Sequence, residues 1–154
     1  MTIDRVGVVG AGAMGSGIIE VMAKAGVAVV ARDIDPGAVE AGRGRVEGSL
    51  GKAVERGKLD ASARAEAAAA ITWTTELEEL AGCQLVIEAA SEVLDLKREI
   101  FATLDEVLAA DAILATNTSS IPVIDIAMGT GRPDRVCGMH FFNPAPVMQL
   151  VEVI

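Results

Sequence analysis

The sequence contains one histidine, His140, the side chain best suited to exchange protons near neutral pH. An apolar run, Val136–Met139, leads into it, and the two prolines of the FFNPAP segment that follows predict a turn. A second apolar run, Leu150–Ile154, then carries Glu152. Two strands joined by such a loop can place a carboxylate against an imidazole, which fixes the tautomer and raises the basicity of the free ring nitrogen. His140 and Glu152 are therefore a candidate acid–base pair, although His140 taken alone is equally consistent with a structural histidine.

A run of small polar side chains, Thr116–Ser120, follows the expected strand Ile113–Ala115. In open α/β sheets ligands bind at the carboxyl ends of the strands, so this run is a candidate ligand contact. The alternative is that Ser119 or Ser120 caps the next helix. Both roles are compatible in one segment.

A glycine-rich turn at residues 10–15, GAGAMG, has the GxGxxG spacing of dinucleotide sites and lies between an expected strand and an expected helix. Its first glycine permits a tight turn, the second lets a pyrophosphate approach the backbone, and the third allows close helix–strand packing. The phosphates then meet the free N–H groups of a helix N-terminus. The alternative is a turn that binds no dinucleotide, or another nucleotide. The residues expected to contact the dinucleotide here are Gly10, Gly12, Ala13, Met14 and Gly15.

Asp33 follows the next apolar run, Val27–Val30, and lies 23 positions after Gly10. A carboxylate at this point accepts hydrogen bonds from the adenosine ribose hydroxyls and repels a 2′-phosphate. The sequence therefore favours NAD over NADP, with the adjacent Arg32 acting in the opposite direction.

Basic residues gather between positions 43 and 58 of an otherwise acidic chain. Five basic and two acidic side chains give this run a surplus of three positive charges, within a chain of net charge −9. A solvated helix face explains such a run, and so does a site for a small molecule that carries several phosphates. Composition does not choose between them. The basic residues are Arg43, Arg45, Lys52, Arg56 and Lys58.

Short β-branched runs alternate with longer amphipathic runs along the chain, which predicts βαβ units. The fold class is therefore α/β, with a doubly wound, mostly parallel sheet. The expected strands are Val6–Val9, Val27–Val30, Leu85–Ile87, Ile113–Ala115, Val136–Met139 and Leu150–Ile154. The expected helices are Ala13–Ala25 (stopped by Gly26), a long helix from the Asp35-Pro36 cap toward Lys58, a helix and turn over Ala61–Ala70, a short helix from a Thr75–Glu78 capping box to Gly82, Leu94–Leu108 and Ile121–Met128.

The composition limits the classes of protein that fit. A chain of 154 residues corresponds to one domain, and its net charge of −9 argues against nucleic acid or an anionic membrane as the main partner. Two cysteines are too few for a disulfide framework. With no targeting or membrane segment in the pattern, we expect a cytoplasmic protein, and no metal site is expected.

Five stretches together resemble the NAD-binding domain of the L-3-hydroxyacyl-CoA dehydrogenase family, and in particular its 3-hydroxybutyryl-CoA dehydrogenases. They are VGVVGAGAMGSGI, RDID, IEAASEVLDLK, ATNTSSIPV and GMHFFNPAPVMQLVEVI. Their order matches the family and they extend over essentially the whole chain. The resemblance implies a Rossmann-type fold, NAD as cofactor, and the oxidation of (S)-3-hydroxyacyl-CoA to 3-ketoacyl-CoA in fatty-acid metabolism.

The resemblance also implies roles for individual residues. His140 matches the catalytic base, Glu152 the carboxylate that orients it, and Ser119 a serine that contacts the substrate oxygen and the cofactor. Asn143 matches a residue at the nicotinamide end. Glu92 and Lys97 match residues near the NAD ribose and nicotinamide. Ser49 and Arg56 match residues that contact coenzyme A, although the family more often has Lys where this chain has Arg56.

Family members are about twice this length, with a helical C-terminal domain that closes over acyl-CoA and forms a homodimer. We therefore expect residues 1–154 to be the NAD-binding domain, incomplete at its C-terminal end, with stand-alone activity in doubt. Two other functions fit the pattern: a gulonate-type sugar-acid dehydrogenase, and a catalytically idle NAD-binding module that acts through a partner.

Overall fold

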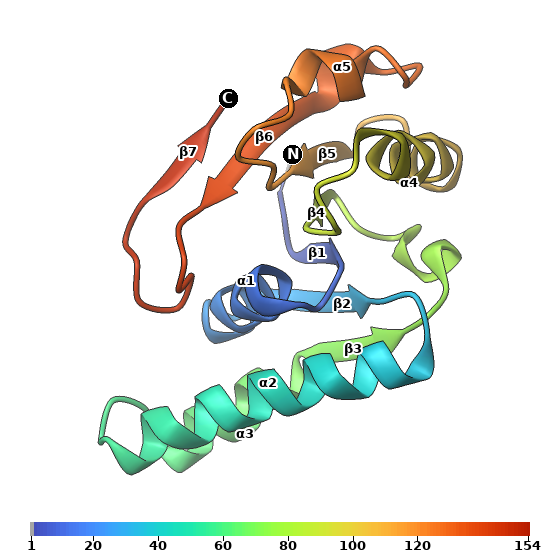
Figure 1. Ribbon diagram of the computed structural model, residues 1–154. Coiled ribbons are helices and arrows are strands. Elements are labelled where there is room, and N and C mark those ends of the chain that lie inside the picture. The colour runs from blue at the N-terminus through green and yellow to red at the C-terminus, as the bar shows by residue number, and fades with distance from the viewer. Residues whose placement is uncertain (1) are drawn as a thin grey trace.

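A single seven-stranded sheet organises the protein, whose structure is a computed structural model that describes residues 2–154 (Figure 1). The strand order is β3-β2-β1-β4-β5-β6-β7, with neighbours parallel except for β7, which runs antiparallel to β6. This confirms the doubly wound, mostly parallel sheet. The strands are β1 (Arg5–Val9), β2 (Ala28–Arg32), β3 (Ile71–Thr74), β4 (Leu85–Glu88), β5 (Ile113–Thr116), β6 (Val136–Phe141) and β7 (Val151–Val153).

Helices cover both faces of the sheet, as right-handed crossovers between parallel strands require. Helices α1, α2 and α3 pack together on one face, and α4 and α5 lie on the other (Figure 1). Two short 3₁₀ turns, η1 (Leu77–Leu80) and η2 (Pro133–Arg135), precede β4 and β6. The helices are α1 (Ala13–Lys24), α2 (Pro36–Glu55), α3 (Ala61–Ala69), α4 (Leu94–Val107) and α5 (Val123–Ala127).

Alternation along the strands divides the apolar core into two layers. In β1, Val8 packs in the cluster under α1 and α2, whereas the next residue, Val9, packs in the cluster under α4. The same division holds for Ala31 and Val30 of β2. Strands buried on both faces read as continuous apolar runs, which is why the sequence identified these strands.

Two of the expected helix boundaries are confirmed. Asp35 caps α2 by accepting a hydrogen bond from the Ala38 N–H at 2.8 Å, and Pro36 occupies the first turn. Gly26 has φ +81° directly after α1, the left-handed conformation that ends a helix.

Three local expectations were wrong. Strand β3 was not expected, because its four residues (Ile71–Thr74) lie between two polar segments and show no long alternation. The Thr75 capping box is absent from the described residues: Thr75 donates to Glu76, and a 3₁₀ turn forms instead of an α-helix. Helix α5 starts only at Val123, because Pro122 keeps the residue before it out of helical geometry.

No helix within residues 2–154 is long and apolar enough to cross a membrane.

The third glycine of the turn is required by close packing. A Cβ atom at Gly15 would lie 1.8 Å from the Gly10 carbonyl oxygen, so Gly15→Ala must displace backbone and should lower the free energy of unfolding by roughly 1–3 kcal/mol or more. Urea unfolding followed by circular dichroism measures the loss. The matched control is Gly48→Ala in α2, where a Cβ meets no heavy atom of residues 2–154 within 4 Å and should add about 0.5–1 kcal/mol. Equal effects from both changes would contradict this account.

Candidate active site

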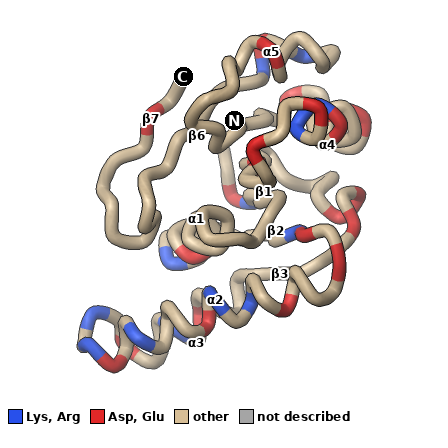
Figure 2. Tube along the Cα trace, viewed as in Figure 1, with Lys and Arg blue, Asp and Glu red and all other residues tan. Residues whose placement is uncertain are grey.

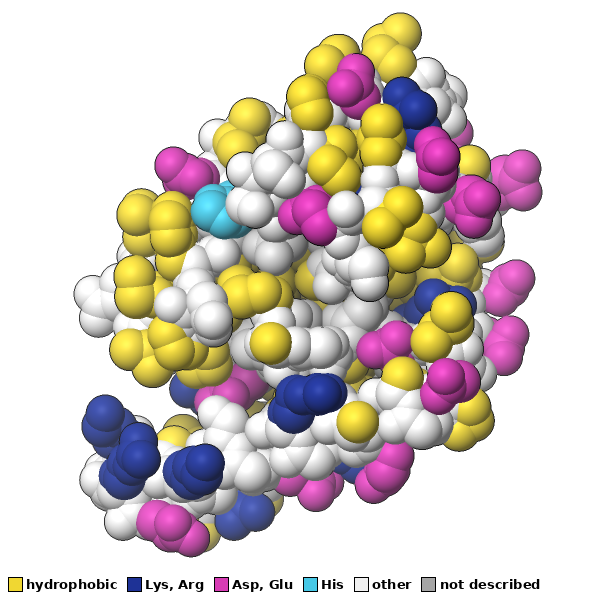
Figure 3. All heavy atoms as spheres, in the orientation of Figure 1, with side chains coloured by type: hydrophobic (Ala, Val, Ile, Leu, Met, Phe, Trp, Pro, Cys, Tyr) yellow, Lys and Arg dark blue, Asp and Glu magenta, His cyan; other side chains and the backbone are white. Residues whose placement is uncertain are grey.

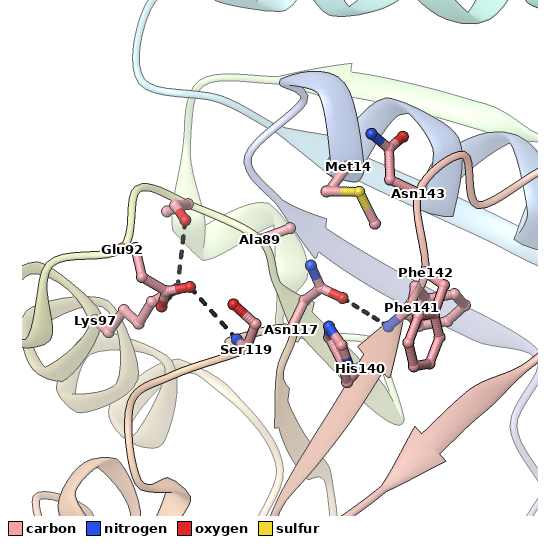
Figure 4. Close-up of a pocket in the computed structure, with 11 residues that line it drawn as sticks. Met14, Ala89, Glu92, Lys97, Asn117, Ser119, His140, Phe141, Phe142 and Asn143 are labelled. Carbon is pink, nitrogen blue, oxygen red and sulfur yellow. Dashed lines mark hydrogen bonds and ion pairs between the residues drawn. The ribbon is translucent and has the colours of Figure 1, made fainter.

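A cavity of about 400 Å³ opens at the carboxyl ends of β4, β5 and β6 (Figure 4). Because these strands are parallel, the loops that follow them meet at one edge of the sheet. Six residues expected from the sequence line this cavity: Met14, Glu92, Lys97, Ser119, His140 and Asn143. Asn117 and Phe142, which were not singled out, line it as well.

The antiparallel pairing of β6 with β7 brings the candidate acid–base pair together. His140 and Glu152 are directly opposed in this ladder, and the His140 Nδ1 atom lies 3.0 Å from a Glu152 carboxylate oxygen. A carboxylate accepts hydrogen bonds, so this contact assigns the proton to Nδ1 and leaves Nε2 with a free lone pair. The Phe142 ring, 4.6 Å away between ring centroids, packs beside the imidazole.

Glu152 lies at the surface. Its side chain is 54% exposed, and all of β7 is exposed as well. The Glu152 carboxylate therefore contacts His140 from a position that stays open to water.

The loop after β5 is tied to its neighbours by side chains. The Asn117 side-chain oxygen accepts a hydrogen bond from the Phe141 N–H at 2.9 Å, which links this loop to the residue after His140. The Thr118 hydroxyl accepts from the Ile121 N–H at 3.0 Å. Thr118, rather than Ser119 or Ser120 as in the alternative considered above, therefore caps the next turn, and Ser119 lines the cavity.

Glu92 and Lys97 lie on the opposite wall of the cavity from His140 (Figure 4). The Lys97 side chain is 1% exposed, and its ammonium lies 2.7 Å from Glu88 and 3.6 Å from Glu92. Glu92 also accepts from the Thr118 hydroxyl at 2.5 Å and from the Ser119 N–H at 3.4 Å. Partial burial acts to raise the pKa of Glu92, but the Thr118 hydrogen bond and the Lys97 charge outweigh it and hold the pKa below its usual value.

The glycine turn has the geometry that a diphosphate requires. Gly10 has φ +95°, which a side chain rarely adopts, and Gly12 faces space in which a Cβ would meet no heavy atom of residues 2–154 within 4 Å. Gly12 is also the N-cap of α1, and the first turn of this helix carries no acidic residue. Its N–H groups are therefore available to an anion, and this part of the site fits a dinucleotide.

Asp33 supports the turn as well as the expected ribose site. One carboxylate oxygen accepts from the Ala11 N–H at 2.8 Å, and the other accepts from the Ile34 N–H at 2.7 Å. Asp33 and Gly12 line a second cavity of about 240 Å³ beside the first. The neighbouring Arg32 donates to the Thr75 carbonyl at 2.9 Å, so its guanidinium is partly committed away from a ribose phosphate.

A third cavity, of about 360 Å³, lies at the C-terminal end of α2, where basic residues gather in Figure 2. Ser49 and Arg56 line it together with Lys52 and Lys58. The wall across from α2 is formed by Pro146 and Val147 of the segment between β6 and β7, along with Lys24 and Glu20 of α1.

Two residues of the basic run do not line this cavity. Arg43 lies over the Trp73 ring at 5.9 Å from its centroid, and Arg45 donates to the Ala11 carbonyl at 3.2 Å. The positive region is therefore narrower than the sequence implied, and it is concentrated in the last turns of α2.

Sequence reasoning missed Glu88, the buried partner of Lys97. The only signal was a carboxylate at the end of the apolar run Leu85–Ile87, which reads as the residue that ends the strand. The structure buries Glu88 completely and surrounds it with donors. Asn117 and Thr118 lay within a run identified as a candidate ligand contact, but their roles depend on loop geometry. Within residues 2–154 no group of three or more His, Cys, Asp or Glu side chains is arranged to hold a metal ion.

Comparison with known proteins finds similar proteins over nearly the whole chain. Residues 5–154 match the family model described as 3-hydroxyacyl-CoA dehydrogenase, NAD binding domain. A 3-hydroxybutyryl-CoA dehydrogenase of Mycobacterium tuberculosis is 52% identical over 99% of this chain and 54% of its own length. The 3-hydroxyadipyl-CoA dehydrogenase of Escherichia coli is 44% identical over 100% of this chain and 32% of its own length.

Solved structures agree with this match. A crystal structure of FadB2 from M. tuberculosis superposes with a TM-score of 0.98 at 51% identity, over 99% of this chain and 54% of that chain. (S)-3-Hydroxybutyryl-CoA dehydrogenase PaaH1 from Ralstonia eutropha gives a TM-score of 0.96 at 44% identity, with the same coverage. The chain therefore spans about half the length of these relatives.

The Thr118–Glu92 hydrogen bond makes a testable contribution to the site. In Thr118→Val the pKa of Glu92 should rise toward its usual 4.5, which a ¹³C NMR titration of the Glu92 carboxyl measures. The lost bonds should also cost roughly 1 kcal/mol of unfolding free energy. Because the folded pKa is lowered, the stabilisation from Glu92 is full above 4.5 and is lost as pH falls through the folded pKa; the variant should lose less stability in that window.

Thr103→Val is the matched control, because Thr103 bonds only to the Glu99 carbonyl on the outer surface of α4. It should leave the Glu92 titration unchanged. Identical titration curves in the parent and in Thr118→Val would contradict the assigned role.

Proposed function

The chain belongs to the 3-hydroxyacyl-CoA dehydrogenase family, whose NAD-binding domain it matches over residues 5–154, and we propose that it carries the cofactor site and the catalytic base of an enzyme that interconverts (S)-3-hydroxyacyl-CoA and 3-ketoacyl-CoA. A short substrate of the 3-hydroxybutyryl-CoA type is proposed from the names of its relatives. The observation that carries this proposal is the His140–Glu152 contact in a cavity that adjoins the dinucleotide turn.

NAD is held, in this proposal, across the two adjoining cavities. The turn at Gly10 and Gly12 receives the diphosphate, Asp33 accepts hydrogen bonds from the adenosine ribose, and the nicotinamide end reaches the cavity of His140. The remaining cofactor contacts are assigned to Ala13, Met14, Gly15, Glu92, Lys97, Ser119 and Asn143. The chemistry that NAD supplies is acceptance of the hydride from C3 of the substrate.

The base in the proposed reaction is the Nε2 atom of His140. The Glu152 carboxylate holds the proton on Nδ1, so Nε2 can accept the proton of the 3-hydroxyl group when the substrate is oxidised. The imidazolium that forms is stabilised by the same carboxylate, and it returns the proton when the ketone is reduced. Ser119, which lines the same cavity, is positioned to hydrogen-bond the substrate oxygen.

The proposed coenzyme A site is the basic cavity of α2. Coenzyme A carries several phosphate charges, and Arg56, Lys52 and Lys58 present positive side chains around Ser49. This positive region is what favours an acyl-CoA over the carboxylate of a sugar acid, which needs no such site.

The 3-hydroxybutyryl-CoA dehydrogenase of M. tuberculosis is about twice as long as this chain. We propose that residues 1–154 act together with a helical C-terminal domain of the family type, which closes over the acyl-CoA and forms the homodimer. An NAD-binding module that is idle by itself and works through a partner is the competing proposal. An assay of acetoacetyl-CoA-dependent NADH oxidation distinguishes these two proposals. It is run with the chain alone and with the separately produced C-terminal half of a relative added.

His140→Gln tests the proposed base. The change should lower the rate of acetoacetyl-CoA reduction by roughly 10²–10⁴-fold, the usual contribution of a general base, because Nε2 is lost. NADH affinity, measured by fluorescence titration, should stay within about twofold of the parent, a shift of roughly 0.4 kcal/mol. Retained turnover in His140→Gln would refute the assignment.

Asp33→Ala tests the ribose contact. The variant should bind NADH roughly 10- to 100-fold more weakly, as expected for the loss of hydrogen bonds to a charged group. NADPH affinity should fall much less, because NADPH loses only the support that Asp33 gives to the turn at Ala11. Asp35→Ala is the control: it removes a helix cap two residues away without removing a ribose contact. An equal loss of NADH and NADPH affinity in Asp33→Ala would contradict the proposal.

A further inference from the structure

Three charged residues form a connected cluster in the wall of the nicotinamide-end cavity: Glu88, Lys97 and Glu92. The Lys97 ammonium bridges the two carboxylates at 2.7 Å and 3.6 Å. The Glu88 side chain is fully buried and that of Glu92 is 42% exposed, so the cluster extends from the core to the cavity surface. Glu92 and Lys97 line the cavity, and Glu88 lies behind them.

The hydrogen bonds of Glu88 fit an ionised carboxylate. Its oxygens accept from the Lys97 ammonium, from the Ala90 N–H at 2.6 Å and from the Thr116 hydroxyl at 2.8 Å. The Thr116 oxygen already accepts from the Thr118 N–H at 3.3 Å, so its own proton points to Glu88. All these partners donate hydrogen bonds, and a protonated carboxyl would have an O–H group facing one of these donors in place of an acceptor.

Glu92 is also ionised at neutral pH, because the Thr118 hydroxyl, the Lys97 charge and the Ser119 N–H together lower its pKa. Two carboxylates and one ammonium leave the cluster with a net charge of −1. The other side chains that line the cavity carry no fixed charge, and His140 lies on the opposite wall from the cluster. The cluster therefore sets the fixed charge of this part of the cavity.

We propose that the Glu88–Lys97–Glu92 cluster sets the relative affinity of the site for oxidised and reduced nicotinamide. Glu88 does not line the cavity; it contributes its charge and holds the Lys97 ammonium in the wall. The inference rests on the proposed function, because it takes the cavity to hold the nicotinamide end of the cofactor. The oxidised ring carries a positive charge and the reduced ring is neutral. A wall of charge −1 stabilises the cationic ring and has little effect on the neutral one, so it favours the oxidised form and lowers the reduction potential of the bound cofactor.

A purely structural role for the cluster predicts something different. The same bonds connect Glu88 to Thr116, and Glu92 to Thr118 and Ser119, so their loss could loosen the loop after β5. Loosening would weaken both cofactor forms together. The ratio of the two dissociation constants separates the electrostatic role from the structural one.

The experiment measures Kd for NADH by fluorescence titration and Kd for NAD⁺ by competition, in the parent and in Glu88→Gln. The isosteric amide brings the cluster to zero charge, so the ratio of Kd for NAD⁺ to Kd for NADH should rise roughly 3- to 10-fold, as a charge several ångströms away in a partly screened site implies. The decisive variant is Glu88→Gln/Lys97→Met, which removes more of the bonds but restores a charge of −1. Its ratio should return to within about twofold of the parent, or roughly 0.4 kcal/mol.

Asp105→Asn is the matched control, because it changes the net charge of the protein by the same amount at the other end of α4, where Asp105 pairs with Arg132. It should leave the ratio unchanged. If Glu88→Gln does not fold, Glu92→Gln brings the cluster to zero charge at a half-exposed position and should raise the ratio in the same way.

Three results would overturn the inference: equal weakening of both cofactor forms in the zero-charge variant, a ratio that stays raised in the double variant, or a ratio that shifts equally in Asp105→Asn. A parent chain that binds neither cofactor form would overturn the proposed NAD site itself, and the inference with it.

Discussion

The site depends on one constraint: parallel strands all end at the same edge of the sheet. The ladder β2-β1-β4-β5-β6 therefore brings residues that are far apart in the sequence to one line of strand ends. Asp33, Gly10, Glu88, Asn117 and His140 lie at or directly after successive strands of this line. The sheet hydrogen bonds and the two apolar layers beneath them hold these residues in place, and bonds such as Asp33 with the Ala11 N–H and Asn117 with the Phe141 N–H join neighbouring loops. Two adjoining cavities along this edge are the consequence of this geometry.

Buried charge is the second feature that organises this edge. A lysine and a glutamate that are both almost inaccessible cost several kcal/mol each to desolvate, and the cost is offset only when every donor and acceptor has a partner. Glu88 meets this demand with the Ala90 N–H, in the loop after β4, and with the Thr116 hydroxyl, at the last residue of β5. The requirement to satisfy one buried pair thus fixes the loop after β4 relative to the end of β5.

The reversal of direction at β7 explains how the acid–base pair forms. A parallel neighbour of β6 would have to come from a distant part of the chain, through a long crossover connection. The turn after β6 instead lets the segment that follows it return antiparallel. His140 then pairs with Glu152, twelve positions away. Much of β7 and the preceding segment is apolar and exposed, as the yellow side chains near the histidine in Figure 3 indicate, with Val147 70% and Val153 74% exposed. The Glu152 carboxylate therefore orients His140 from the surface, whereas the Glu88 carboxylate lies in the core.

Local signals in the sequence are enough to predict the fold class, six of the seven strands, the glycine turn and the candidate base. These signals are apolar runs, glycine spacing and a single histidine. The sequence did not identify β3, whose four residues pair with β2 at the edge of the sheet. It also did not identify Glu88, or Thr118 as the cap. These depend on which groups meet across strand ends, on burial and on the donors that surround a carboxylate. Such contacts between distant residues exist only once the sheet has assembled, and the tertiary structure alone decided them.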